Sequence, residues 1–159
     1  MAAAARLPPN MAQRITYRLR VRYDECDQQG VVFNSHYFAY FDVALTEAFR
    51  HAGHPYGEMT ASGTDLMVAE AHARYRAPAR FDDEIELEWW ITRLGNTGMS
   101  TRIDVKRGGE LLVQGEMRHV FVDLSKGGKR PIPDDVRRAL EPYAEEAGAD
   151  SGTEAEARA

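Results

Sequence analysis

The sequence predicts a single α+β domain in which an antiparallel sheet wraps around one long helix. Two observations support this prediction. Several segments alternate apolar and polar residues, and one segment, residues 35–52, repeats its apolar residues every three or four positions. A period of two is typical of a half-buried strand, and a period near 3.6 of an amphipathic helix. A chain of 159 residues has the length of one domain, and no internal repeat or linker divides it.

The first strand and the loop after it are marked by a change of pattern. Over residues 15–23, apolar residues and tyrosines alternate with threonine and arginine, as expected of a strand with one buried face. Residues 24–30 are polar and end at Gly30, which predicts a loop. The apolar residues 31–33 follow, and then Asn34 and Ser35, two residue types that cap helices.

The long helix is predicted over residues 35–52. Its apolar stripe comprises Phe38, Phe41, Leu45, Ala48, Phe49 and Ala52. Gly53 has the position of a left-handed C-cap, and Pro55 prevents the helix from continuing. We expect this helix to be the longest in the chain and the only one in the core.

Four more strands and a short helix complete the predicted fold. The strands are expected over residues 66–76, 85–91, 99–105 and 111–122. Gly108 and Gly109 predict a tight hairpin turn between the last two. The short helix is expected over residues 134–143, because Pro133 and two aspartates stand at its start.

Composition limits the function classes and the domain boundaries. We interpret residues 1–13 as a disordered leader, residues 14–143 as the domain, and residues 144–159 as a disordered acidic tail. The net charge of −5 lies mostly in that tail, and no basic cluster indicates nucleic-acid binding. No segment reaches the roughly 20 apolar residues of a membrane-spanning helix. With one cysteine and no signal peptide, the predicted location is cytoplasmic.

Three carboxylates, Asp24, Glu25 and Asp27, stand immediately before the long helix. A helix N-terminus presents unpaired N–H groups and a partial positive charge, which can polarise a carbonyl oxygen during attack on a thioester. A carboxylate beside it can act as nucleophile or general base. Acids before a helix are usually caps, so spacing alone does not decide between an acyl-transfer site and a cap.

Residues 23–37, YDECDQQGVVFNSHY, resemble the signature of the 4-hydroxybenzoyl-CoA thioesterase family. The shared pattern is an aspartate, a glycine, a hydrophobic pair, an aromatic residue, a polar residue and a tyrosine that opens the helix. The similarity continues through residues 41–44, 70–75, 78–84, 92–95 and 107–112, and covers roughly residues 16–140. The resemblance implies a hot-dog fold, an antiparallel five-stranded sheet around one long central helix with a short C-terminal helix.

The resemblance also implies hydrolysis of an acyl-CoA or aroyl-CoA thioester to the free acid and CoA. Asp27 falls on the family's catalytic aspartate, which acts as nucleophile or general base. Asn34 falls on the residue whose backbone N–H holds the thioester carbonyl. Active sites of the family lie between two subunits, so a homodimer or a dimer of dimers is implied. No cofactor is expected, because CoA is part of the substrate.

Several other residues are candidates for the substrate site. Phe33 and Tyr37 are expected either in the acyl pocket or in the core, and His36 either at the pocket or on the surface. This chain has residues 95–98, GNTG, where the hydroxybenzoyl enzyme has a basic cluster that meets the CoA phosphates. The phosphates must therefore meet other basic residues. Arg74 and Arg93 are candidates, together with Arg76, Lys126, Lys129 and Arg130.

Other functions fit the sequence less well. The main alternative is a non-catalytic hot-dog module that binds acyl-CoA, and a hot-dog dehydratase would need an aspartate–histidine motif that we do not find. A Gly-x-Ser-x-Gly elbow, the mark of a serine hydrolase, is absent from the sequence. His51 and His54 lack further ligands at metal-binding spacing, and Cys26 has no partner that would mark it as a nucleophile.

Overall fold

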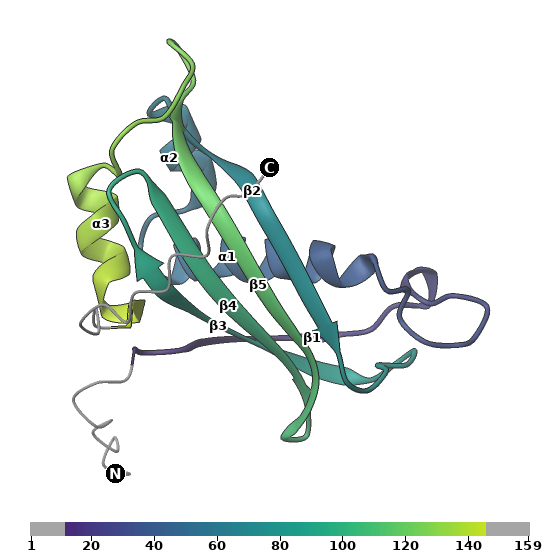
Figure 1. Cartoon of the computed structure of the whole chain (residues 1–159). Coiled ribbons are helices and arrows are strands. Elements are labelled where there is room, and N and C mark those ends of the chain that lie inside the picture. The colour runs from purple at the N-terminus through teal and green to yellow at the C-terminus, as the bar shows by residue number, and fades with distance from the viewer. Residues whose placement is uncertain (1–11, 146–159) are drawn as a thin grey trace, which may run out of the picture.

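The computed structural model describes residues 12–145, and most of the predicted leader and acidic tail lies outside them. The elements are β1 (Ile15–Arg20), η1 (Tyr23–Glu25), α1 (His36–His51), α2 (Tyr56–Ala61), β2 (Thr64–Tyr75), β3 (Glu84–Leu94), β4 (Gly98–Arg107), β5 (Glu110–Asp123), α3 (Asp134–Leu140) and η2 (Glu141–Tyr143). The five strands form one antiparallel sheet, and α1 crosses one of its faces (Figure 1). The predicted α+β class and hot-dog arrangement are confirmed.

The order of strands in the sheet is β1-β3-β4-β5-β2. β1 and β2 are therefore the edges, and β3, β4 and β5 form the centre, where the burial of alternate residues is most complete. β2 pairs only with β5 among the described residues, in a register that aligns Leu66 with Phe121 and Tyr75 with Val113. Most of β2 is exposed, including Met67 and Val68, whose exposed fractions are 57% and 53%.

The buried face of α1 is wider than the predicted stripe. It comprises Tyr37, Tyr40, Phe41, Ala44, Leu45, Ala48 and Phe49. Phe38 and Ala52, which the spacing also placed on the stripe, are only partly buried. The Phe41 ring lies so close to Gly115 of β5 that a Cβ at Gly115 would stand 2.5 Å from its Cζ. The helix can approach the sheet this closely because residue 115 has no side chain.

Several details differ from the prediction. β1 ends at Arg20 rather than at residue 23, and residues 23–25 form η1. α1 is not the only helix in the core, because α2 and α3 also contribute side chains to it. α2 was not expected, because six residues are too few to display a helical period. β2 begins at Thr64, two residues earlier than expected. Ala144 forms a bridge with Ile91, and the Glu145 carboxylate accepts a hydrogen bond of 2.8 Å from the Trp90 indole. Residues 144 and 145, which the prediction assigned to the acidic tail, therefore contact β3.

Within residues 12–145, none of the helices combines the length and the apolar character that crossing a membrane requires.

Candidate active site

A tight turn fixes the backbone and one carboxylate oxygen of Asp27. The Gly30 N–H donates to the Asp27 carbonyl at 2.9 Å, and the Asp27 N–H donates to the Val31 carbonyl at the same distance. The Gln29 N–H donates to Asp27 Oδ1 at 2.8 Å. Gly30 has a φ of +74°, a conformation that glycine adopts without steric cost. Among the described residues Oδ2 accepts no hydrogen bond, so it is available to a substrate or a water.

Contacts from distant segments hold the loop between Asp27 and α1. The Val32 N–H donates to the Ala79 carbonyl at 2.9 Å, and Val31 forms a bridge with Arg80. The Ala79 N–H donates to the Tyr37 hydroxyl at 3.2 Å. These bonds place the loop along residues 79–80, the segment before β3.

A pocket of about 300 Å³ opens between the loop, the start of α1 and the end of β2. It is lined by Asp27, Gln29, Val31, Val32, Asn34, Tyr37, Tyr75, Arg76, Ala77 and Pro78. We call it the Asp27 pocket. The Tyr75 hydroxyl donates to the Asn34 carbonyl at 2.8 Å and so joins the two sides. A carboxylate and the residue before a helix therefore border the same cavity.

The start of α1 lacks a side-chain cap. Ser35 occupies the N-cap position, but its side chain makes no capping hydrogen bond. Within residues 12–145 the Asn34 N–H also has no hydrogen-bond acceptor. Unpaired N–H groups at a helix start can stabilise negative charge that develops on a carbonyl oxygen.

Glu25 is a residue of this site that sequence analysis did not single out from the neighbouring acids. It is buried, and its carboxylate accepts hydrogen bonds from the Tyr40 hydroxyl at 2.6 Å and the Arg22 N–H at 2.8 Å. His36 Nε2 lies 3.3 Å from the same carboxylate. Burial alone would raise the pKa of Glu25, but the hydrogen bonds from Arg22 and Tyr40 and the charge of Arg22 outweigh it and lower the pKa. Glu25 thus joins the loop to the first two turns of α1.

The structure brings some of the predicted site residues together and separates others. Asp27, Asn34 and Tyr37 line the Asp27 pocket. Phe33 is half exposed and His36 contacts Glu25, and neither lines the pocket. Arg74 borders a groove on the outer face of the sheet, and Arg93 borders another beside residues 95–100.

Arg76 is the basic residue that lines the Asp27 pocket. It was one of six candidates for contact with the CoA phosphates, but the sequence offered no means of choosing it. Its Nε and Nη2 atoms donate to Gln114 Oε1 at 3.2 and 2.8 Å, which fixes the guanidinium beside the pocket.

Cys26 is unsuited to nucleophilic chemistry. Burial, together with the neighbouring Glu25 and Asp27 carboxylates, raises the pKa of its thiol. A raised pKa keeps the thiol protonated, and the thiolate is the reactive form. Among residues 12–145 no three histidine, cysteine or acidic side chains are grouped to hold a metal ion.

Comparison with known proteins identifies the class. The model of the thioesterase-like superfamily matches residues 21–140. The acyl-CoA thioester hydrolase YbgC of Escherichia coli is 32% identical over 119 residues, covering 74% of this chain and 89% of that protein. A crystal structure of a hypothetical protein from Thermus thermophilus superposes with a TM-score of 0.77 at 34% identity, covering 82% of this chain and 98% of that chain.

The 4-hydroxybenzoyl-CoA thioesterase of a Pseudomonas species is 24% identical over 126 residues, covering 76% of this chain and 89% of that protein. The fold and these matches define a hot-dog thioester hydrolase. The chain belongs to the thioesterase-like superfamily. The predicted family and enzyme class are confirmed, whereas the oligomeric state and the cellular location stay predictions.

Proposed function

We propose that the protein hydrolyses an acyl-CoA or aroyl-CoA thioester to the free acid and CoA, with Asp27 as the catalytic carboxylate. The observation that supports this most directly is the shared pocket, where Asp27 and Asn34 border one cavity at the uncapped start of α1. The thioester carbonyl would accept a hydrogen bond from the Asn34 N–H. Asp27 would then supply the attack, and the Asn34 N–H would stabilise the charge on the carbonyl oxygen. These are the two requirements of acyl transfer.

Two chemical routes use these groups. In the first, Asp27 Oδ2 attacks the carbonyl carbon, the carbon–sulfur bond breaks, and CoA leaves as a thiolate from a mixed anhydride that water then hydrolyses. In the second, Asp27 removes a proton from a water that attacks the carbonyl directly, and the thiolate leaves from the tetrahedral intermediate. A single turnover in ¹⁸O-labelled water separates them, because only the anhydride route can place label in the Asp27 side chain.

We further propose that a second copy of the chain covers β2. This strand is a 12-residue edge with exposed apolar side chains, and such edges pair readily with another chain. Antiparallel pairing of two β2 strands would extend the sheet across a two-fold axis. Tyr75, at the end of β2, lines the Asp27 pocket, so the partner strand would complete the walls of that pocket. A dimer of dimers would need a second interface on another face of the chain.

The same symmetry suggests where CoA lies. Antiparallel pairing brings the beginning of one β2 near the end of the other. The groove lined by Arg93, Arg118 and residues 95–100 lies near the beginning of β2, because Val120 of β5 aligns with both Gly98 and Met67. We propose that Arg93 and Arg118 contact the phosphates of CoA bound at the partner's Asp27 pocket. Arg74, on the edge strand itself, and Phe33 and His36, beside the pocket, remain proposed substrate contacts.

A thiol-release assay over aromatic, short and long acyl-CoAs tests the function. We expect release with at least one class and a loss of kcat by about 10²- to 10⁴-fold in Asp27→Asn. Asp24→Asn is the matched control, because Asp24 belongs to the same loop but is exposed and lies outside the pocket. Near-wild-type activity of Asp27→Asn would overturn the assignment. Binding without release across the whole panel would instead indicate an acyl-CoA-binding module.

A further inference from the structure

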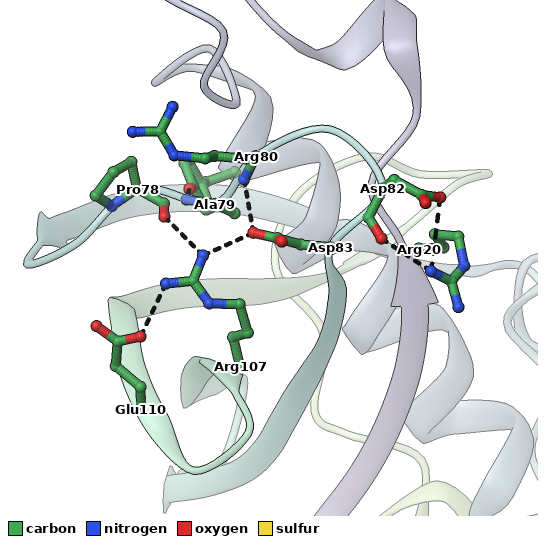
Figure 2. Close-up of polar contacts among 9 residues, drawn as sticks. Arg20, Pro78, Ala79, Arg80, Asp82, Asp83, Arg107 and Glu110 are labelled. Atoms are coloured by element: carbon green, nitrogen blue, oxygen red, sulfur yellow. Dashed lines mark hydrogen bonds and ion pairs between the residues drawn. The ribbon is translucent and has the colours of Figure 1, made fainter.

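One arginine contacts both ends of the 78–83 turn (Figure 2), whose first residue, Pro78, lines the Asp27 pocket. Arg107, at the end of β4, donates from Nη1 to the Pro78 carbonyl at 3.2 Å and to Asp83 Oδ2 at 2.7 Å. Its Nη2 donates to Glu110 Oε2 at 2.8 Å. The Arg80 N–H also donates to Asp83 Oδ2, at 2.8 Å. A single guanidinium therefore joins both ends of the 78–83 turn to the β4–β5 hairpin.

The contact between Arg107 and Asp83 is charged and only partly exposed to water. The side chains of Arg107 and Asp83 are 34% and 23% exposed. Burial alone would raise the pKa of Asp83, but the Arg80 N–H and the Arg107 guanidinium outweigh it and lower the pKa. The Asp83 and Glu110 carboxylates raise the pKa of Arg107. Charge-assisted hydrogen bonds of this kind are stronger than neutral ones and restrict geometry more tightly.

The 78–83 turn sets the position of the loop that carries Asp27. Ala79, next to Pro78, accepts the Val32 N–H, and Arg80 bridges Val31. The carbonyl of Val31 in turn accepts the Asp27 N–H. Two steps of backbone pairing thus connect the Arg107 clamp to the proposed catalytic carboxylate. Asn34 follows Val32 closely in the same loop.

We propose that Arg107 is a positioning residue: by clamping the 78–83 turn it aligns Asp27 and the Asn34 N–H on one thioester carbonyl. This inference rests on the proposed function. Reacting groups displaced by about 1 Å lose roughly 10²-fold in rate. Loss of the clamp should therefore lower kcat far more than it changes KM, because Arg107 does not line the pocket.

Arg20 offers a matched control on the same turn. Its Nη1 donates to the Asp82 carbonyl at 2.8 Å (Figure 2). Its Nη2 donates to Glu84 Oε2 at 3.1 Å. Neither Asp82 nor Glu84 lines the pocket or pairs with the Asp27 loop. Arg20→Met thus removes an arginine that contacts the far side of the same turn, where its ion pairs are more exposed than those of Arg107 with Asp83.

The test is steady-state hydrolysis of a CoA thioester accepted by the wild type, with full-length Arg107→Met, Arg107→Lys and Arg20→Met. We expect Arg107→Met to lower kcat by about 10- to 100-fold with KM within about threefold. Arg107→Lys should fall between it and the wild type, since an ammonium cannot reproduce the guanidinium fork. Arg20→Met should keep kcat within about twofold of the wild type.

Two results would overturn the inference: a kcat of Arg107→Met within about twofold of the wild type, or an equal loss in Arg20→Met. If Arg107→Met does not fold, Glu110→Ala removes one anchor of the same guanidinium and should give a smaller fall in kcat at unchanged KM. An unchanged kcat there would also refute the clamp. Failure of the proposed function shows separately, as an active Asp27→Asn enzyme or an inactive wild type.

Discussion

Replacing Gly115 with alanine should destabilise the protein by about 1–3 kcal/mol, because the new methyl group would overlap the Phe41 ring. The Cβ would stand 2.5 Å from Cζ and 2.7 Å from Cε1 and Cε2, whereas ordinary contact begins near 3.4 Å. Helix and sheet would have to separate by roughly 1 Å. Phe41 cannot rotate away, because its side chain is buried within the core cluster. A chain of this length loses about 2–4 °C in Tm for each kcal/mol.

The assay is urea and thermal unfolding followed by circular dichroism at one fixed protein concentration. Gly57→Ala is the control, since no atom lies within 4 Å of its added Cβ and α2 tolerates alanine. In a Phe41→Leu background, which lacks the clashing ring atoms, the Gly115→Ala change should lose most of its effect. The steric argument would be refuted by a Gly115→Ala protein within about 0.5 kcal/mol of the wild type, or by an undiminished effect in the Phe41→Leu background.

Three further perturbations concern buried or bridging polar groups. Tyr40→Phe removes the 2.6 Å hydrogen bond to buried Glu25 and should lower the free energy of unfolding by about 1–3 kcal/mol, measured in urea; a change under about 0.5 kcal/mol would contradict it. Burial lowers the pKa of His119 below its usual 6.5, so near that pH the unfolded chain binds a proton that the folded chain excludes. The free energy of unfolding should therefore fall as the pH drops through 6.5. His119→Leu should flatten this dependence in urea titrations between about pH 5 and 7.5, and parallel curves would count against it. Tyr75→Phe removes the 2.8 Å hydrogen bond to the Asn34 carbonyl. Because one hydrogen bond contributes roughly 1 kcal/mol, kcat in the thiol-release assay should fall several-fold. An unchanged kcat would show that this bond does not position Asn34.

Periodicity was sufficient to predict the elements that bury one clear face. α1 and the central strands carry their own pattern, and the Gly108–Gly109 turn needs only two residues, both with positive φ. α2 has six residues, too few for a period to emerge. The hydrogen-bond partner of Trp90 could not be predicted either, because it is Glu145, which lies 55 residues further along the chain.

The candidate site could be predicted only where it is local. Asp27 and Asn34 are seven positions apart, so the loop and the helix start were visible in the sequence. The opposite wall, with Tyr75 and Arg76, comes from a strand whose end meets the loop only after folding. Glu25 looked like one of three equivalent acids, because its partner Tyr40 lies 15 residues away on a helix face. Local patterns do not record such long-range pairings.

The hydrogen bonds that join the two sides of the Asp27 pocket include Tyr75 to Asn34 and Ala79 to Tyr37, whose partners lie 41 and 42 positions apart in the chain. During synthesis, the loop that carries Asp27 would emerge well before the segment that braces it. The complete Asp27 pocket therefore forms only when residues 75–79 have joined the fold.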